Sequence, residues 1–470
     1  MSELIDRSAV ELAAMIKRRE ISAREMLAAS LQRIEQVNRQ VNAVVTLVPE
    51  MAEAWADDAD QLTASGAPLG PLHGLPIAHK DLEFTAGIRT TKGSPLLADF
   101  VPTEDGLIVQ RLRSAGAITI GKTNTPEFGA GSQTFNPVFG ATKNPYDVTK
   151  TCGGSSGGAA VALATGMIPI ADGSDMGGSL RNPASFCNIV GLRPSAGRVP
   201  GWPNSTPWSG LATSGAMARS VDDLALQMQV IAGPDQRVPI SLPEPGSIFA
   251  RLAELDVAGL RVAWSSALGL PVDPAVSAAL SDVPDRLSAL GCHVVEAMPD
   301  LTDARETFQV LRAWRFEVST GALYDSAPEQ FKDTVRWNIE EARRRSLVDH
   351  AAATAAHAAL VVRIHEFFES YDVLALPTSQ VAPFDVELDW PRSVAGEPMP
   401  TYIDWMRSCS DISLTGCPAI SMPSGFTPDG LPVGVQFVGR PRGDVDLLRF
   451  ARVWERASEA SSRRATVAAT

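Results

Sequence analysis

The chain has 470 residues, of which 45% are hydrophobic and 20% charged, and this composition is that of a soluble globular protein with a large core. Its formal net charge of -13 at pH 7 argues against a nucleic-acid partner and against an anionic membrane, because both need a surplus of lysine and arginine on a surface. Five cysteines without a CxxC spacing predict neither a disulfide framework nor a zinc site.

The compartment is predicted from the N-terminus and the apolar runs. The first residues show no basic stretch followed by an apolar run, so we expect no secretory signal. The longest nearly apolar run, residues 159–171, is interrupted by Thr165 and Gly166 and is shorter than the ~20 residues that span a bilayer. With so few cysteines, we expect a cytoplasmic protein without a membrane anchor.

Two helices are predicted at the N-terminus, over residues 8–19 and 22–38. Each begins with a capping box, in which a serine is followed three residues later by a glutamate and the two side chains satisfy free N–H groups at the helix start. The second helix has an apolar stripe at helical spacing, which we expect to pack on the body of the protein.

From residue 75 onward, short apolar runs alternate with helical stretches, and this alternation predicts an α/β protein with a mixed or largely parallel sheet. Because strand candidates stand before and after a long middle region, we expect one sheet to be built from both ends of the chain. The strand candidates are residues 75–78, 117–120, 260–264, 373–376 and 433–438. Between the second and third of these strands, a glycine-rich turn leads into an apolar run at 159–163, and a further apolar run follows at 168–171. A helix is predicted at residues 105–114.

The middle region, residues 234–371, begins with a polar, proline-bearing segment and then becomes mainly helical. Three helices are predicted, over residues 274–290, 303–320 and 328–369. Such a helical region either covers an active site or completes a layer beside the sheet.

Residues 116–123 match the phosphate-binding pattern GxxxxGK[ST] letter for letter. The context argues against nucleotide binding, because a phosphate-binding loop needs a flexible turn with a helix starting at the lysine. Here the residues between the glycines read as a strand, and Pro126 follows soon after Lys122.

Residues 153–157 fit GxSxG, the pattern of the nucleophile elbow in α/β-hydrolases. That interpretation requires an acid and then a histidine downstream. The downstream histidines are His293, His350, His357 and His365, and the last three lie in a helical stretch without turn residues around them. An esterase of this kind stays an alternative.

Lysine is the other candidate base for a serine nucleophile. A neutral amine accepts the hydroxyl proton if burial lowers its pKa from ~10.4 toward neutrality. Lys80 ends a predicted apolar strand, which places its amine at a desolvated strand end. The simpler interpretation is a lysine that reaches water or pairs with Asp81.

Three stretches together resemble the amidase signature family: residues 74–80, residues 153–158, and residues 175–181 with the Pro-Ala and Gly-Leu-Arg-Pro segments that follow. Ser155 and Ser179 are separated by 24 positions, the family's interval between its bridging serine and its nucleophile. The clear resemblance covers about residues 70–200, with a weaker similarity at 431–441.

The resemblance implies a fold, a single large amidase-signature domain over residues 1–470 with a central mixed, twisted β-sheet surrounded by α-helices. Its core comprises about residues 70–232 and 372–445, and the mainly helical region 233–371 shapes the substrate pocket. It also implies no metal or organic cofactor, and the family often forms homodimers.

The resemblance further implies a Ser-cisSer-Lys triad. Ser179 attacks the acyl carbon, Ser155, preceded by a non-proline cis peptide in the family, relays the proton, and neutral Lys80 receives it. The N–H groups of Met176, Gly177, Gly178 and Ser179 form the oxyanion hole. Ser174, Met176 and Leu180 depart from the family's usual threonine, threonine and isoleucine, which changes the pocket wall more than the backbone donors.

The expected reaction is cleavage of the C–N bond of a small-molecule amide or acyl hydrazide. An alternative is the A subunit of a tRNA-dependent amidotransferase, which has the same core and acts as a glutaminase. Substrate choice depends on less recognisable regions. Aromatic residues that could line an apolar pocket are Trp202, Trp208, Trp314 and Tyr402, with Ser132 as a polar substrate contact.

Overall fold

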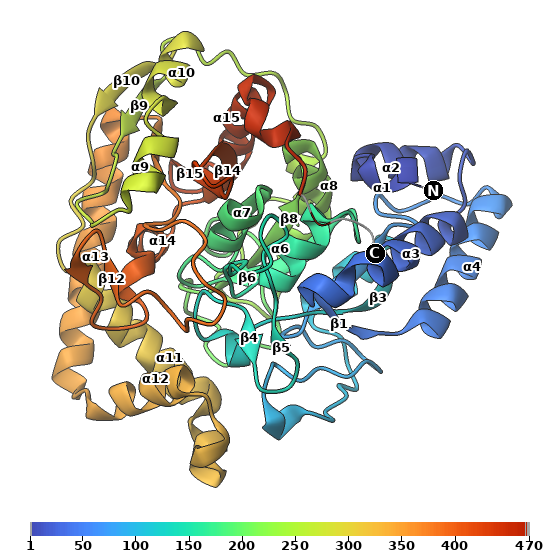
Figure 1. The fold of residues 1–470 in the computed structure, drawn as a ribbon, viewed down its shortest axis with the longest axis horizontal. Helices are drawn as coiled ribbons and strands as arrows, with labels where there is room; N and C mark the ends of the chain where they lie inside the picture. The colour runs from blue at the N-terminus through green and yellow to red at the C-terminus, as the bar shows by residue number, and fades with distance from the viewer. Residues whose placement is uncertain (1, 466, 468–470) are drawn as a thin grey trace.

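The structure is a computed structural model that describes residues 2–465 and 467 (Figure 1). Its strands are β1 (Val44–Leu47), β2 (Pro76–Lys80), β3 (Ile118–Thr123), β4 (Phe135–Asn136), β5 (Gly140–Ala141), β6 (Ala171–Asp175), β7 (Val190–Arg193), β8 (Thr213–Ala218), β9 (Arg261–Trp264), β10 (His293–Glu296), β11 (Val373–Pro377), β12 (Ser393–Val394), β13 (Glu397–Pro398), β14 (Ala419–Phe426) and β15 (Pro432–Gly439). Its α-helices are α1 (Ser2–Asp6), α2 (Ala9–Lys17), α3 (Ala23–Val41), α4 (Pro49–Ser65), α5 (Leu107–Ser114), α6 (Gly157–Ala164), α7 (Arg181–Cys187), α8 (Val221–Ile231), α9 (Pro274–Ala279), α10 (Val283–Ala289), α11 (Ala304–Ser326), α12 (Asp333–Arg344), α13 (Leu347–Ser370), α14 (Arg407–Leu414) and α15 (Asp444–Ala457).

A large mixed sheet lies at the centre of one α/β domain. Within the described residues it has eight strands in the order β10-β9-β11-β15-β14-β7-β8-β6. Strand β9 pairs in parallel with β10 and β11, and the other neighbours are antiparallel. The strands come from before, within and after the middle region, so a sheet built from distant parts of the chain is confirmed. The predicted strands 75–78 and 117–120, however, belong to a separate sheet.

Strand β2, which ends in Lys80, belongs to a second, smaller sheet with the order β1-β3-β2. It pairs in parallel with β3 and packs against β6, the edge strand of the large sheet. The boundary between the two sheets is therefore the place where β2 and β6 bring their side chains together.

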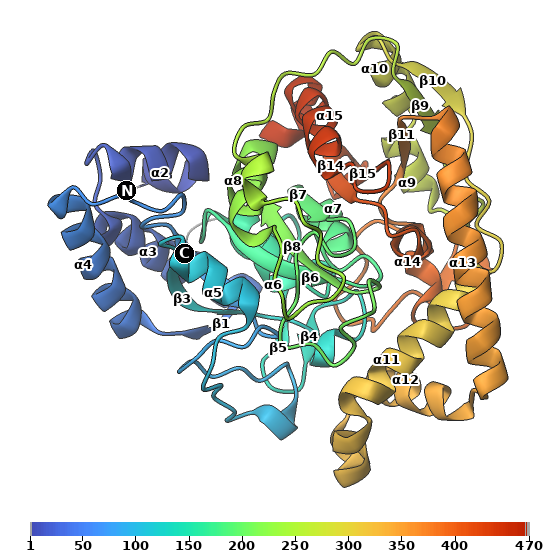
Figure 2. The same ribbon diagram turned by 180° about the vertical axis from the view of Figure 1, so that it is seen from behind.

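The N-terminal helices form a layer on one side of the molecule, coloured blue in Figures 1 and 2. Both predicted capping boxes are present, with Ser8 and Ser22 accepting hydrogen bonds from the backbone N–H groups of Glu11 and Glu25. The apolar stripe of α3 is buried, so its predicted packing on the body is confirmed. Such a cap contributes ~1 kcal/mol to helix stability.

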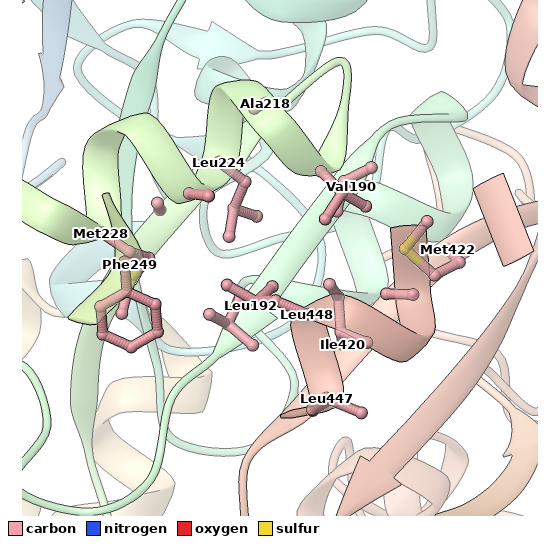
Figure 3. Packing of buried hydrophobic residues seen from close by; sticks show 14 of the residues in the cluster. Val190, Leu192, Ala218, Leu224, Met228, Phe249, Ile420, Met422, Leu447 and Leu448 are labelled. Atoms are coloured by element: carbon pink, nitrogen blue, oxygen red, sulfur yellow. The ribbon is translucent and has the colours of Figure 1, made fainter. Parts of the chain in front are cut away.

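Helices α8 and α15 cover the sheet through aliphatic side chains. Figure 3 shows Leu192 of β7 beside Leu448 of α15 and Ile420 of β14, with Leu224 of α8 close by. All four are fully buried. Because burying one such side chain contributes roughly 1.5–3 kcal/mol to the stability of the fold, this cluster stabilises the packing of α8 and α15 on the sheet.

The middle region is less continuous than predicted. The helix expected over residues 274–290 is two short helices, α9 and α10, and the long helix expected over 328–369 is divided into α12 and α13. The second division follows from Ser346, whose hydroxyl caps α13 in a further capping box. Strand β10, which the sequence pattern missed, has two exposed and two half-buried residues and pairs with β9 at the sheet edge.

Helix α11 packs against α12, α13 and α14 at one end of the molecule, and α13 also contacts α14 (Figures 1 and 2). In the part of the chain that the structure describes, α13 alone has the length and apolar composition of a membrane-crossing helix. This finding rests on length and composition only and assigns no membrane.

Candidate active site

Lys80 lies at the boundary between the two sheets and is fully buried. Its Nζ donates hydrogen bonds to the hydroxyls of three serines, at 2.8 Å to Ser155, 2.9 Å to Ser156 and 3.1 Å to Ser174. The structure thus brings the predicted base and the predicted relay into direct contact.

Burial lowers the pKa of the Lys80 amine from 10.5 to about 7, although the carboxylates of Glu83, Asp175 and Asp172 oppose the change. Desolvation disfavours the charged ammonium and is the largest cause of this change. The amine is therefore able to accept a proton near neutral pH.

Asp172 on β6 fixes the end of β2. Its carboxylate accepts the backbone N–H of Lys80 at 2.8 Å and forms a second hydrogen bond with Nδ1 of His79. The other ring nitrogen of His79 is 3.1 Å from the Thr119 hydroxyl. These contacts hold the strand that carries the amine.

The loop before α6 carries Ser155 after a cis peptide bond between Gly154 and Ser155. The Ser132 hydroxyl donates to the Gly154 carbonyl at 2.7 Å and accepts from the Asn182 amide at 2.9 Å. Ser132 does not line the cavity that contains Ser155. Its contacts support this loop rather than a substrate.

Asp175, at the end of β6, supports the turn that carries Ser179. Its carboxylate accepts N–H groups from Gly178 at 2.9 Å and Leu180 at 3.1 Å, and it forms a buried ion pair with Arg181. Burial alone would raise the pKa of Asp175, but Arg181 and Arg193 hold it below its ordinary value. The turn is therefore held by a permanently ionised carboxylate.

The four predicted oxyanion-hole donors differ in their contacts. The N–H of Gly178 is engaged by Asp175. Those of Met176, Gly177 and Ser179 find no hydrogen-bond partner within residues 2–465 and 467. Gly178 has a φ of +117°, a conformation that favours glycine.

Ser179 is half-buried and faces a cavity of about 720 Å³ that Ser155, Ser174 and Met176 also line. Its carbonyl accepts the N–H of Ser156 at 3.1 Å, which ties the two serine-bearing loops together. Among the described residues the hydroxyls of Ser155 and Ser179 form no hydrogen bond with each other. Catalytic hydrogen bonds often tighten only when a substrate is bound.

The predicted aromatic residues separate into three places. Trp202 lines the Ser179 cavity. Trp208, which is 77% exposed, and Trp314 line a second cavity of about 550 Å³, which borders the first through the loop around Ser205 and Ser209. Tyr402 lines neither cavity and is buried in a polar contact with Arg312.

The two alternative motif interpretations find no support in the geometry. Lys122 lies within β3 and donates to the Glu83 carbonyl and the Thr85 hydroxyl, so residues 118–123 form a strand and not a phosphate-binding loop. Within the described part of the chain, the only base in contact with Ser155 is the Lys80 amine.

Sequence reasoning missed other residues that line the Ser179 cavity. They are Glu83, Phe84, Phe128, Arg312 and Arg315. Glu83 could have been noticed because it follows Lys80 by three positions at a strand end. Arg312 and Arg315 could have been noticed because no acidic residue stands three or four positions from either on its helix.

A hydroxyl beside a buried amine of lowered pKa, with free N–H groups on a nearby turn, is the arrangement expected of an acyl-transferring hydrolase. Residues 25–448 match the family model described as Amidase. The chain belongs to this family, the amidase signature enzymes.

Three relatives match almost the whole chain. An acylamidase of Rhodococcus erythropolis is 36% identical over 452 residues, covering 95% of this chain and 94% of the acylamidase. The A subunit of the glutamyl-tRNA(Gln) amidotransferase of Moorella thermoacetica is 36% identical over 487 residues, covering 98% of this chain and 99% of the Moorella protein. A solved bacterial aryl acylamidase has a TM-score of 0.91 and 28% identity, covering 97% of each chain. The protein is a hydrolase that acts on the C–N bond of amides.

Proposed function

We propose that the protein, as a free enzyme, hydrolyses a small-molecule amide or acyl hydrazide through an acyl-enzyme on Ser179, with Lys80 as base and Ser155 as proton relay. The observation that carries this proposal is the 2.8 Å contact between Lys80 Nζ and Ser155 Oγ inside a buried site. A lysine with a pKa of about 7 suits it, because such an amine is partly neutral at physiological pH.

In the proposed mechanism the proton moves from Ser179 through Ser155 to Lys80. The Ser179 hydroxyl attacks the carbonyl carbon while its proton passes to Ser155 and the Ser155 proton passes to Lys80. When the tetrahedral intermediate collapses, the C–N bond breaks and the leaving nitrogen takes a proton from Ser155, which recovers one from Lys80. Water then cleaves the acyl-enzyme by the same route.

The oxyanion of the intermediate is stabilised by the free N–H groups of Met176, Gly177 and Ser179. The N–H of Gly178 contributes indirectly, since its bond to Asp175 holds the turn open toward the cavity. One such donor typically lowers the barrier by ~3 kcal/mol.

The test is a hydrolysis screen of the purified protein over aryl amides, alkyl amides, hydrazides, esters and glutamine, with Ser179→Ala as the blank. Lys80→Ala and Ser155→Ala should each lower kcat by at least ~10³-fold, whereas the exposed Ser281→Ala control should not. Mass spectrometry should find the acyl group on the peptide containing Ser179. Full activity in Lys80→Ala, or an adduct on Ser155 instead, would refute the mechanism.

A second candidate function is that of an amidotransferase A subunit, because the Moorella protein is as similar in sequence as the acylamidase. In that case the purified chain would release ammonia from glutamine only when its partner proteins are present, and it would leave anilides and hydrazides intact. We favour the free amidase because the acidic chain has no basic surplus for tRNA.

We further propose that the enzyme works in the cytoplasm as a homodimer without metal or organic cofactor. Light scattering of the purified chain tests the dimer, and dialysis against a chelator, which should leave the activity unchanged, tests the absence of a metal.

A further inference from the structure

Two arginines of α11, Arg312 and Arg315, line the same cavity as Ser179. They stand three positions apart, so their side chains project from one face of the helix. Met176 connects this face to the proposed oxyanion hole, because Nη1 of Arg312 lies 3.2 Å from the Met176 sulfur.

These two arginines differ from their neighbours in having no carboxylate partner. Eight arginines lie between residues 305 and 363, and six of them are within 4.0 Å of an aspartate or glutamate. In the part of the chain that the structure describes, Arg312 and Arg315 form no such pair. The six paired arginines are Arg305, Arg336, Arg343, Arg344, Arg345 and Arg363.

Arg312 is held rigidly although it is unpaired. Its Nη2 and Nε donate to the Tyr402 hydroxyl at 2.8 and 3.2 Å, and its guanidinium lies 4.8 Å from the centre of the Phe316 ring. The residue is 3% exposed, so its guanidinium is fixed in the wall of the cavity. This arrangement supplies a fixed positive potential to the cavity.

Arg315 keeps free donors. One of its nitrogens donates to the Thr206 hydroxyl, and the others have no protein partner among the described residues. Burial lowers the pKa of Arg315 to about 10, and no carboxylate opposes this change. A desolvated guanidinium without a counterion is unfavourable, and a bound anion would relieve that cost.

The other charged residues that line the cavity have neighbours of opposite charge. Asp175 is paired with Arg181, and Lys92 has the carboxylates of Glu83 and Asp81 as its charged neighbours. The excess positive charge therefore comes from α11. It contrasts with the chain as a whole, whose net charge is -13.

We propose that Arg315, supported by the fixed charge of Arg312, binds an anionic group of the substrate, so that this hydrolase selects amides that carry a carboxylate. This inference rests on the proposed function, since it places the carboxylate in the cavity where Ser179 attacks. A planar guanidinium with several free donors suits a carboxylate, which it binds through parallel hydrogen bonds.

The test compares matched para-nitroanilides and anilides. On the acyl side, the glutaryl para-nitroanilide carries a carboxylate and the pentanoyl para-nitroanilide does not. On the amine side, N-pentanoyl-4-aminobenzoate is compared with pentananilide. We expect at least one anionic member to have a kcat/KM more than ~10-fold above its neutral partner, the effect of one charge-assisted hydrogen bond.

Arg315→Gln should reduce this anionic-to-neutral ratio to near one, and Arg315→Lys should retain part of it. Arg363→Gln is the matched control, because this arginine lies on α13, outside the cavity, and already faces Asp300. It should leave the ratio unchanged. Added salt should lower the ratio of the unmodified enzyme, because it screens the pairing of charges.

Direct binding separates failure of this inference from failure of the proposed function. The inactive Ser179→Ala protein should bind the glutaryl anilide more tightly than pentananilide by calorimetry, whether or not either is hydrolysed by the active enzyme. If neutral amides are hydrolysed, but neither the kcat/KM ratios nor binding favour the carboxylate, the anion site is refuted and the proposed function stands. If the carboxylate binds but no amide is hydrolysed, the proposed function fails instead.

Discussion

The buried amine of Lys80 predicts how hydrolysis depends on pH. The fall of its pKa from 10.5 to about 7 corresponds to a net ~5 kcal/mol against the ammonium, at ~1.4 kcal/mol per pH unit, after the neighbouring carboxylates have offset part of its desolvation. At pH 7 about half of the molecules then hold a neutral base, compared with roughly one in 3,000 for an ordinary lysine. If the neutral amine is the reactive form, kcat/KM follows this fraction.

We therefore expect kcat/KM to rise about tenfold per pH unit below the pKa and to level off above it, so that the value at pH 5 is about one fiftieth of that at pH 7. The assay is the initial rate of para-nitroanilide hydrolysis in constant-ionic-strength buffers, with Ser179→Ala subtracted at each pH. Circular dichroism at each pH shows whether the protein stays folded. An optimum near pH 5, or a rate independent of pH across this range, would refute a neutral lysine base.

Glu83 supplies a perturbation of the same profile. Its carboxylate raises the pKa of Lys80, so Glu83→Gln should lower that pKa and move the rising limb to lower pH. The ratio of the rate at pH 6 to the rate at pH 8 should therefore increase in this variant. Glu50→Gln, on the exposed face of α4, is the control and should leave the ratio as it is. A shift to higher pH in Glu83→Gln would contradict the electrostatic assignment.

Three further predictions concern the turn of Ser179 and the N-terminal layer. Asp175→Asn leaves the buried Arg181 and Arg193 without their counterion, so we expect the free energy of unfolding to fall by ~3–5 kcal/mol. Urea denaturation measures this loss, and an unchanged midpoint would contradict the prediction. Gly178→Ala should abolish hydrolysis, because the glycine has a φ of +117° and a Cβ there would lie 2.6 Å from atoms of Asn182 and Cys409. A near-normal kcat in steady-state kinetics would disprove this prediction. Ser22→Ala should lower stability by only ~1 kcal/mol without affecting kcat, as tested by the same two measurements.

The features that could be predicted from the sequence are those set by neighbouring residues. The capping boxes at Ser8 and Ser22 depend on two side chains one helical turn apart, and both are present. A strand over residues 117–120 is predicted from their apolar, β-branched character, and β3 confirms it. The contact between Lys80 and Ser155 is implied by the resemblance to the amidase signature family, and the two groups do meet.

The features that could not be predicted depend on distant parts of the chain. Whether an aromatic residue faces Ser179 depends on how the loop around residues 200–212 folds against α11, and this separates Trp202 from Trp208 and Trp314. Trp208 and Trp314 line the second cavity together with His357 of α13 and Leu414 of α14. No local pattern records such an arrangement.

Strand β6 explains how the two proposed reactants keep a fixed relation. Asp172 and Asp175 are three positions apart on it, and an odd separation places their side chains on opposite faces of the strand. From one face, Asp172 holds the backbone of Lys80, and at the strand end Asp175 holds the turn of Ser179. Base and nucleophile are thus positioned from a single edge strand, whose other edge is paired with β8. The selectivity that we propose comes from α11, so substrate preference can change by substitutions on that helix without disturbing the strand on which the chemistry depends.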